Sequence, residues 1–194
     1  MTEAKKSGEG ILRLTIVLFL VSAITALVLG LVNHVTADRI EAINSENKAS
    51  AMQEVLPADE YLPVKYEGDD KNVADIYQAV SGDTLGYVVQ VTSSGFGGDV
   101  EMMVGVDFNG SVTGISIISH SETSGLGAVA ASNTSAGESF RGQFAGQSGE
   151  LAVTKDGGTI DALTGATVTS RAVTAGVNAA VAAAGELLPV DTVK

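Results

Sequence analysis

Cysteine is absent from this chain of 194 residues, and only two histidines occur in it, His34 and His120. The lack of cysteine excludes a disulfide, a thiolate zinc site, a cysteine-ligated iron–sulfur cluster and a thiol nucleophile. Two histidines also argue against a histidine-rich metal centre or a bis-histidine haem. An organic cofactor is therefore the natural candidate if the chain carries electrons.

Positive charge is also scarce, because 11 lysine and arginine residues stand against 23 aspartate and glutamate residues, for a formal net charge of −12. Nucleic acid is bound through clustered basic residues, so we expect no nucleic-acid partner. The length is sufficient for one domain with a sizeable core and an appendage.

An uncharged, strongly apolar run extends from Leu14 to Val32. At about 1.5 Å per residue, a helix over this run approaches the roughly 30 Å hydrocarbon thickness of a bilayer. Basic residues are more frequent before the run than soon after it, which favours the amino terminus inside and the bulk of the chain outside. They are Lys5, Lys6 and Arg13 before it, and Arg39 and Lys48 after it.

The alternative for this segment is a cleaved signal peptide, since the small residues at 35–37 resemble a cleavage site. We favour a retained anchor in the membrane lipid, because the run is longer than the roughly 7–15 apolar residues of a signal peptide. The predicted organisation is a cytoplasmic amino terminus (1–13), a transmembrane helix (14–33), a juxtamembrane helix or linker (34–58) and an extracytoplasmic domain (59–194).

The sequence pattern of the predicted extracytoplasmic part indicates an α+β fold, in which helices pack on an antiparallel sheet. Four strands follow one another with turn residues between them, and a helix with one apolar stripe follows near the end of the chain. Pro57 and Pro63 interrupt the pattern, and the charged stretch after them indicates a loop. The predicted strands cover 75–80, 85–91, 100–107 and 112–119, with a short further strand at 151–153; the predicted helices cover 34–56 and 168–188.

The most informative motif is Asp161–Ser170, where hydroxyl-bearing and small residues directly precede the predicted helix 168–188. The entrance of a helix offers unpaired backbone N–H groups and the positive end of the helix dipole, which together favour a phosphate. In the alternative interpretation Gly165 supplies a turn and a hydroxyl caps the helix. The candidate caps are Thr164, Thr167, Thr169 and Ser170.

Two further segments are rich in glycine. In the loop His120–Gly127, Gly125 and Gly127 would let the backbone approach a flat ligand, and Glu122 and Thr123 would bond to its polar edge. The alternative is a flexible polar loop. The segment Ser94–Gly98 is either part of the same site or a glycine-rich turn with a buried aromatic residue. Neither segment matches a Walker loop or a dinucleotide-binding motif.

Five motifs occur in a fixed order, and together they resemble a known family. They are Gly95–Gly98, Asn109–Gly110, His120–Gly127, Phe140–Phe144 and Asp161–Ser170. In this order, behind an amino-terminal anchor, they resemble the FMN-binding domain of Rnf-complex G subunits and of the related C subunit of Na⁺-translocating NADH:quinone reductases. The compact length is more similar to the G subunit. Ser124 stands where the family commonly has proline, which would leave that loop less rigid.

The resemblance implies that FMN is bound covalently, through a phosphoester to Thr167, and that a flavin transferase attaches it from FAD. It implies that Leu163–Ala166 form the recognition segment, that Thr169 and Ser170 donate to the phosphate, and that Asp161 holds the turn. The loop at 120–127 and the turn at 95–98 would flank the flavin ring. The complete set of implied cofactor-binding residues is Thr167, Thr164, Gly165, Ala166, Thr169, Ser170, Asp161, Glu122, Thr123, Gly125, Leu126, Gly127, His120, Gly97 and Gly98.

The implied role is electron transfer within a membrane complex that couples ferredoxin and NAD oxidation–reduction to Na⁺ or H⁺ pumping, with other membrane and iron–sulfur subunits as partners. We expect no catalytic residue, no metal and no independent catalysis; the redox chemistry belongs to the flavin. The apolar run contains no ionisable group, so pumping would lie in the partners. The alternatives are the quinone-reductase C subunit, a stand-alone extracytoplasmic flavin carrier, and, from another class, a membrane-anchored binding domain without cofactor.

Overall fold

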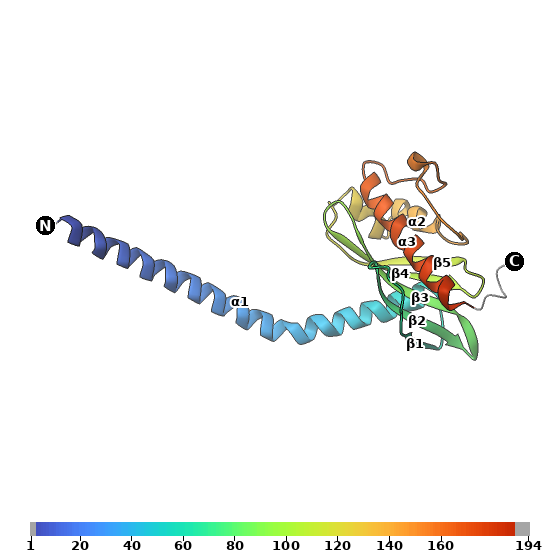
Figure 1. Ribbon diagram of the computed structural model, residues 1–194, viewed down its shortest axis with the longest axis horizontal. Helices are drawn as coiled ribbons and strands as arrows, with labels where there is room; N and C mark the ends of the chain where they lie inside the picture. Colours follow the sequence, from blue (N-terminus) through green and yellow to red (C-terminus); the bar gives the residue numbers. More distant parts are fainter. Residues whose placement is uncertain (1–2, 189–194) are drawn as a thin grey trace. The chain divides into compact units, whose positions relative to one another are not determined.

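The computed structural model describes residues 3–188, and the side chains of residues 12–188. The predicted cytoplasmic segment (1–13) and extracytoplasmic domain (59–194) therefore extend beyond the described residues at their outer ends. The chain divides into two units, residues 1–46 and 47–194. Figure 1 shows a long amino-terminal helix, and a sheet with further helices.

Helix α1 (Glu3–Val55) contains the apolar run and continues through the predicted juxtamembrane segment. The two helices predicted at 14–33 and 34–56 are thus one continuous helix. The hydroxyl of Thr25 donates to the carbonyl of Val21 at 2.8 Å, so a polar side chain inside the run is satisfied by its own helix. Within the described residues, α1 is the one helix long and apolar enough to cross a membrane.

The second unit is built on a five-stranded antiparallel sheet whose spatial order is β1-β2-β3-β4-β5. The strands are β1 (Glu60–Val64), β2 (Val73–Ser81), β3 (Asp83–Ser94), β4 (Asp99–Asp107) and β5 (Val112–His120). All four main predicted strands are confirmed, and the observed strands are longer. The loop predicted at the charged stretch after Pro63 is confirmed, since residues 65–72 form no strand or helix. Strand β1 was not predicted, because Pro63 interrupts the pattern; proline is tolerated in a strand at a sheet edge.

One face of the sheet is covered by helix α3 (Thr167–Leu187), which confirms the predicted apolar stripe. Val173 and Val177 are fully buried against the core. A Cβ at Gly176 would lie 3.0 Å from Cε of Met102, so glycine lets the helix approach the sheet closely. This packing fixes the position of the first turn of α3 over the end of the sheet.

The opposite face of the sheet is covered by the last turn of α1, which belongs to the second unit. Ala51 and Val55 are buried there against Val88 and Met103. Burial on both faces explains why β3 and β4 are apolar in continuous runs instead of alternating.

Short elements connect the sheet to α3. They are the 3₁₀ helix η1 (Gly127–Ala131), helix α2 (Ser135–Gly142) and the 3₁₀ helix η2 (Thr154–Asp156). The strand predicted at 151–153 is wrong, because Val153 forms only an isolated bridge with Ile160. Phe140 and Phe144 stack edge to face at 5.5 Å and anchor α2 in the core.

Candidate functional site

The first turn of α3 follows a tight turn in which Gly165 has a φ of +76°. The residue at the helix cap is Ala166, and within the described residues no side chain caps the helix. The alternative in which Thr164, Thr167, Thr169 or Ser170 serves as the cap is therefore wrong. The first backbone N–H groups of α3 keep the capacity to bind an anion from outside the helix.

The turn before α3 is held by two side chains from other positions. Ser170 is fully buried, and its hydroxyl accepts from the N–H of Leu163 and donates to the carbonyl of Ala166, both at 3.0 Å. Gln143 binds the backbone of Asp161 on both sides, at 2.7 Å to its N–H and 3.1 Å to its carbonyl. The carboxylate of Asp161 is exposed, so Ser170 and Gln143 hold this turn in the role predicted for Asp161.

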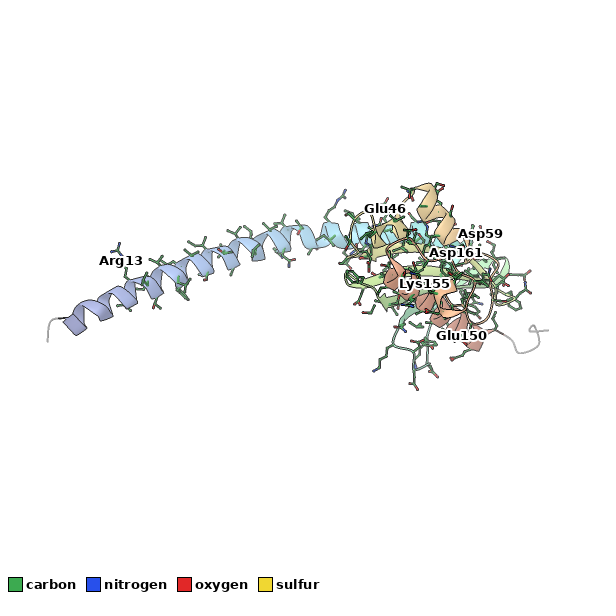
Figure 2. The ribbon with its side chains drawn as sticks, turned by 90° about the horizontal axis from the view of Figure 1, so that it is seen from above. Arg13, Glu46, Asp59, Glu150, Lys155 and Asp161 are labelled. Atoms are coloured by element: carbon green, nitrogen blue, oxygen red, sulfur yellow. The ribbon has the colours of Figure 1, made fainter. Side chains whose placement is uncertain are left out.

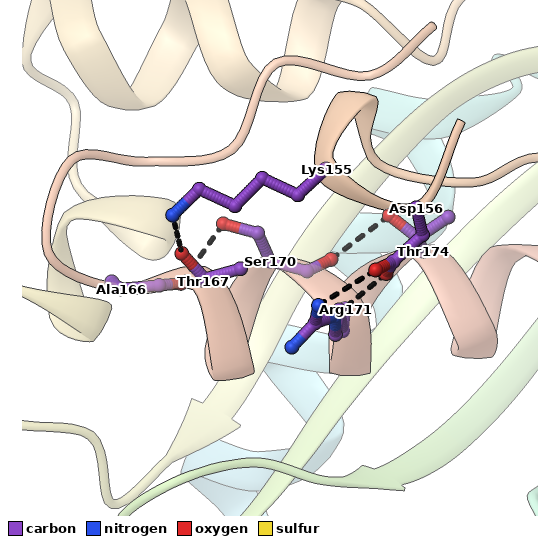
Figure 3. Close-up of polar contacts among 7 residues, drawn as sticks. All are labelled: Lys155, Asp156, Ala166, Thr167, Ser170, Arg171 and Thr174. Atoms are coloured by element: carbon purple, nitrogen blue, oxygen red, sulfur yellow. Dashed lines mark hydrogen bonds and ion pairs between the residues drawn. The ribbon is translucent and has the colours of Figure 1, made fainter. Parts of the chain in front are cut away.

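Thr167 is the first residue of α3, and a lysine side chain reaches its hydroxyl. Nζ of Lys155 donates to Oγ1 of Thr167 at 3.0 Å (Figure 3). Lys155 and Asp161, labelled in Figure 2, both come from the segment between α2 and α3. The hydroxyl that the resemblance singled out is thus next to a cation that had not been predicted.

An ion pair beside this contact fixes η2 to α3. Nε and Nη2 of Arg171 donate to the two carboxylate oxygens of Asp156, each at 2.6 Å (Figure 3). Hydrogen bonds from the Arg171 guanidinium hold the pKa of Asp156 below its ordinary value. Because Asp156 follows Lys155 in the chain, the pair keeps the lysine beside the start of the helix.

A cavity of about 330 Å³ opens next to Thr167. Eight predicted site residues line it: Glu122, Thr123, Leu126, Gly127, Gly165, Ala166, Thr167 and Thr169. Three unpredicted residues complete the lining: Phe96, Lys155 and Val168. Phe96 is 73% exposed, so the interpretation of its segment as a turn around a buried aromatic residue is wrong. The volume lies in the usual range of small-molecule sites.

Glu122 is 9% exposed and joins three segments that are distant in the sequence. Its Oε1 accepts from the backbone N–H groups of Phe96 at 2.7 Å and Gly97 at 3.2 Å. Its Oε2 accepts from the hydroxyl of Thr169 at 2.8 Å. Both oxygens therefore bind protein donors in this structure, and the bond from Glu122 to a ligand edge stays a prediction.

Two glycines without a Cβ leave room for the Glu122 carboxylate. A Cβ at Gly127 would overlap Oε2 of Glu122 and Oγ1 of Thr169, and a Cβ at Gly95 would overlap Oε1 of Glu122. Gly127 was predicted to let the backbone approach a ligand. In the structure it lines the cavity and also makes room for the Glu122 side chain.

The remaining predicted residues lie outside the cavity lining or turn their polar groups elsewhere. Thr169 and Ser170 are buried, and their hydroxyls donate to Glu122 and to the carbonyl of Ala166; their donation to a phosphate stays a prediction. Nδ1 of His120 accepts from the N–H of Glu122 at 3.3 Å.

A second cavity, of about 560 Å³, is lined in part by Gly125, Asp161 and Thr164. Gly97 acts through its bond to Glu122, and Gly98 has a φ of +150° in the same turn.

Lys155 is the functional residue that sequence reasoning missed most clearly. Between residues 142 and 188 the only basic residues are Lys155 and Arg171. An isolated lysine twelve positions before a predicted phosphate-bearing threonine was therefore an available signal. Its position beside Thr167 depends on the turn at η2, which no pattern in the sequence predicted.

Comparison with known proteins identifies the family. A family model described as FMN-binding domain matches residues 95–182. The chain is 39% identical over 192 residues to the G subunit of the Na⁺-translocating ferredoxin:NAD⁺ oxidoreductase complex of Acetobacterium woodii, a match that covers 87% of this chain and 88% of that protein. It is 33% identical over 183 residues to the G subunit of the ion-translocating oxidoreductase complex of Methanosarcina acetivorans, a match that covers 90% of this chain and 94% of that protein.

Among solved structures, the crystal structure of the C subunit of Na⁺-translocating NADH-quinone reductase from Parabacteroides distasonis is similar, with 22% identity and a TM-score of 0.49. The similarity covers 70% of this chain and 79% of that one. The extent of the sequence match to the G subunits, nearly end to end in both partners, decides the assignment. The chain belongs to the family of G subunits of ion-translocating oxidoreductase (Rnf) complexes, and it carries an FMN-binding domain.

Proposed function

We propose that this chain relays electrons within a membrane-bound ferredoxin:NAD oxidoreductase complex that translocates ions, and that it carries FMN bound covalently at Oγ1 of Thr167. The names of its relatives and the FMN-binding domain support the redox role. The observation that carries the attachment site is the position of Thr167. Its hydroxyl lies at the uncapped start of α3, on the cavity wall, and 3.0 Å from a lysine ammonium group.

The residues at this position fit a phosphate. The first N–H groups of α3 have no capping side chain within the described chain, so they can bind an anion at the helix start. Lys155 adds a positive charge at this position, which would pair with the negative charge of an attached phosphodiester. In the attachment, the Thr167 oxygen forms a bond to the flavin-side phosphorus of FAD, the pyrophosphate bond breaks, AMP leaves, and the hydroxyl proton is released.

The rest of the cavity fits the apolar part of the cofactor. Leu126 and Val168 are 46% and 45% exposed, and with Phe96 they form an apolar rim around the cavity. Exposed apolar side chains around a concave site are typical of ligand sites. FMN, when bound, supplies the electron-carrying chemistry, and the chain binds and orients it. A covalent bond would prevent loss of the cofactor from a domain outside the cytoplasm.

The proposed arrangement in the membrane follows from α1. Residues 14–33 would cross the bilayer, residues 1–13 would lie in the cytoplasm, and the domain predicted from residue 59 onward would lie outside. The absence of charge between Leu14 and Val32 and the basic residues before it support this orientation. Other membrane and iron–sulfur subunits of the complex would exchange electrons with the flavin.

The attachment is tested by expressing the full chain in cells that also contain a flavin transferase. We expect the wild type and Thr167→Ser to fluoresce in a denaturing gel, and their intact mass to increase by one FMN less one water. Thr167→Ala should show neither signal. Thr154→Ala, an exposed threonine in η2, is the matched control and should be modified like the wild type.

The assignment fails if Thr167→Ala keeps the added mass, or if the wild type lacks it while the transferase modifies another substrate in the same cells. Retention of the mass on a different residue, found by peptide mapping, would move the attachment site without removing the flavin.

A further inference from the structure

The charged side chains in the cavity lining are Glu122 and Lys155, and they have opposite signs and different surroundings. Glu122 is 9% exposed, whereas Lys155 is exposed on η2. Charges that are buried interact strongly with their neighbours, because little water or salt screens them. The negative charge therefore has a larger influence on an occupant of the cavity than the positive charge.

The carboxylate of Glu122 is held in one position. All three partners of its oxygens are donors, namely two backbone N–H groups and the Thr169 hydroxyl. This is the arrangement expected around an ionised carboxylate, which can only accept. The close approach of Gly95 and Gly127 leaves the side chain no room to rotate away. The cavity thus has a fixed negative charge in its wall.

We propose that Glu122 lowers the reduction potential of the flavin held at Thr167, and that Lys155 raises it by a smaller amount. This inference rests on the proposed function. Two-electron reduction with uptake of one proton from solvent leaves the flavin with one additional negative charge. A fixed carboxylate in the same cavity disfavours that charge, so the oxidised flavin is stabilised relative to the reduced one. An ammonium group does the reverse, and its exposure weakens the effect.

The experiment is a redox titration of the full flavinylated chain in detergent micelles, with dithionite as the two-electron donor and indicator dyes as the reference. We expect Glu122→Gln to raise the midpoint potential by about 30 mV or more, which is a tenfold change in the equilibrium constant of a two-electron couple. Lys155→Gln should lower the potential by less. Asp99→Asn, which removes an exposed carboxylate near the same turn, should leave it unchanged.

Thr169→Val separates charge from hydrogen bonding, because it keeps the carboxylate and removes one of its donors. We expect its potential to lie closer to the wild type than to Glu122→Gln. An equal shift in Thr169→Val and Glu122→Gln would overturn the proposal, as would an unchanged or lower potential in a flavinylated Glu122→Gln.

Folding and flavin attachment are checked first, by melting temperature and intact mass. If Glu122→Gln does not fold, Lys155→Gln still decides the question, because its site is exposed; an unchanged or raised potential there overturns the proposal. A wild type without FMN would instead overturn the proposed function, and the inference with it. A flavinylated set of variants with equal potentials would leave the proposed function intact and overturn only this inference.

Discussion

The substitution Gly127→Ala adds one methyl group at the most crowded point of the site. An ideal Cβ at this position would overlap Oε2 of Glu122 and Oγ1 of Thr169, and it would lie 3.0 Å from Cβ of Glu122. Thr169 is 1% exposed, and Glu122 is nearly as buried, so neither can move into solvent. The hydrogen bond that joins them must lengthen or break.

The expected loss of stability has two parts. A hydrogen bond to a charged group contributes about 1.5–3 kcal/mol, and overpacking of a filled site costs about 1–3 kcal/mol. The two sum to about 2.5–6 kcal/mol, and because the site can relax in part we take roughly 3–5 kcal/mol as the expected loss. For a domain of this size each kcal/mol lowers the melting temperature by roughly 2–4 °C, so we expect a decrease of roughly 6–20 °C.

The assay is thermal and urea unfolding of the full chain in detergent, compared with Gly142→Ala. A Cβ at Gly142, the last residue of α2, meets nothing within 4 Å, so this control should be as stable as the wild type. The double variant Gly127→Ala with Thr169→Ala should lose less stability than the sum of the single variants, because the threonine oxygen causes part of the overlap. A Gly127→Ala chain that melts within about 2 °C of the wild type would refute the reasoning.

Three further predictions concern the surroundings of the site. Ser170→Ala removes the hydroxyl that holds the turn before α3, so we expect several-fold less flavin on the chain by in-gel fluorescence; attachment equal to the wild type would show that the turn needs no such support. Phe144→Ala empties a fully buried position in the core and should cost about 3–5 kcal/mol in urea unfolding; a value below about 1 kcal/mol would contradict the packing. The pKa of Asp156 is lowered from 3.8 by Arg171, so the stabilisation by this pair is complete above that pH and is lost as the pH falls through the lower folded-state pKa. Asp156→Asn should therefore lower the melting temperature at neutral pH, and its difference from the wild type should shrink as the pH falls through the lowered pKa of Asp156; a difference that grows on acidification would contradict the sign.

Much of the fold could be predicted from the sequence, because its determinants are local. Apolar runs separated by turn residues indicated the order of β2 to β5, and an apolar stripe indicated α3. Strand β1 was missed because its pattern includes Pro63, which a local rule counts against a strand. Only the pairing of β1 with β2 at the sheet edge makes that proline acceptable.

The site could be predicted as a set of segments, whereas their roles could not. The motifs around Gly97, Glu122 and Thr167 do meet at one cavity. The sequence offers no means to decide whether a glutamate faces a ligand or binds its own backbone, since that depends on contacts between distant segments. The same limit applies to Lys155, whose partner lies in another element.

Each edge of the sheet has a feature that hinders pairing with a further strand. At one edge, β1 is short and contains Pro63, which cannot donate a ladder hydrogen bond. At the other edge, Val112 exchanges backbone hydrogen bonds with Gly146 and Gln147 at 2.7 and 2.8 Å. A neighbouring protein therefore finds less free backbone at these positions, and we expect it to recognise the domain through side chains. Such contacts can form and release without disrupting a sheet, as the proposed exchange of electrons with a donor and an acceptor would require.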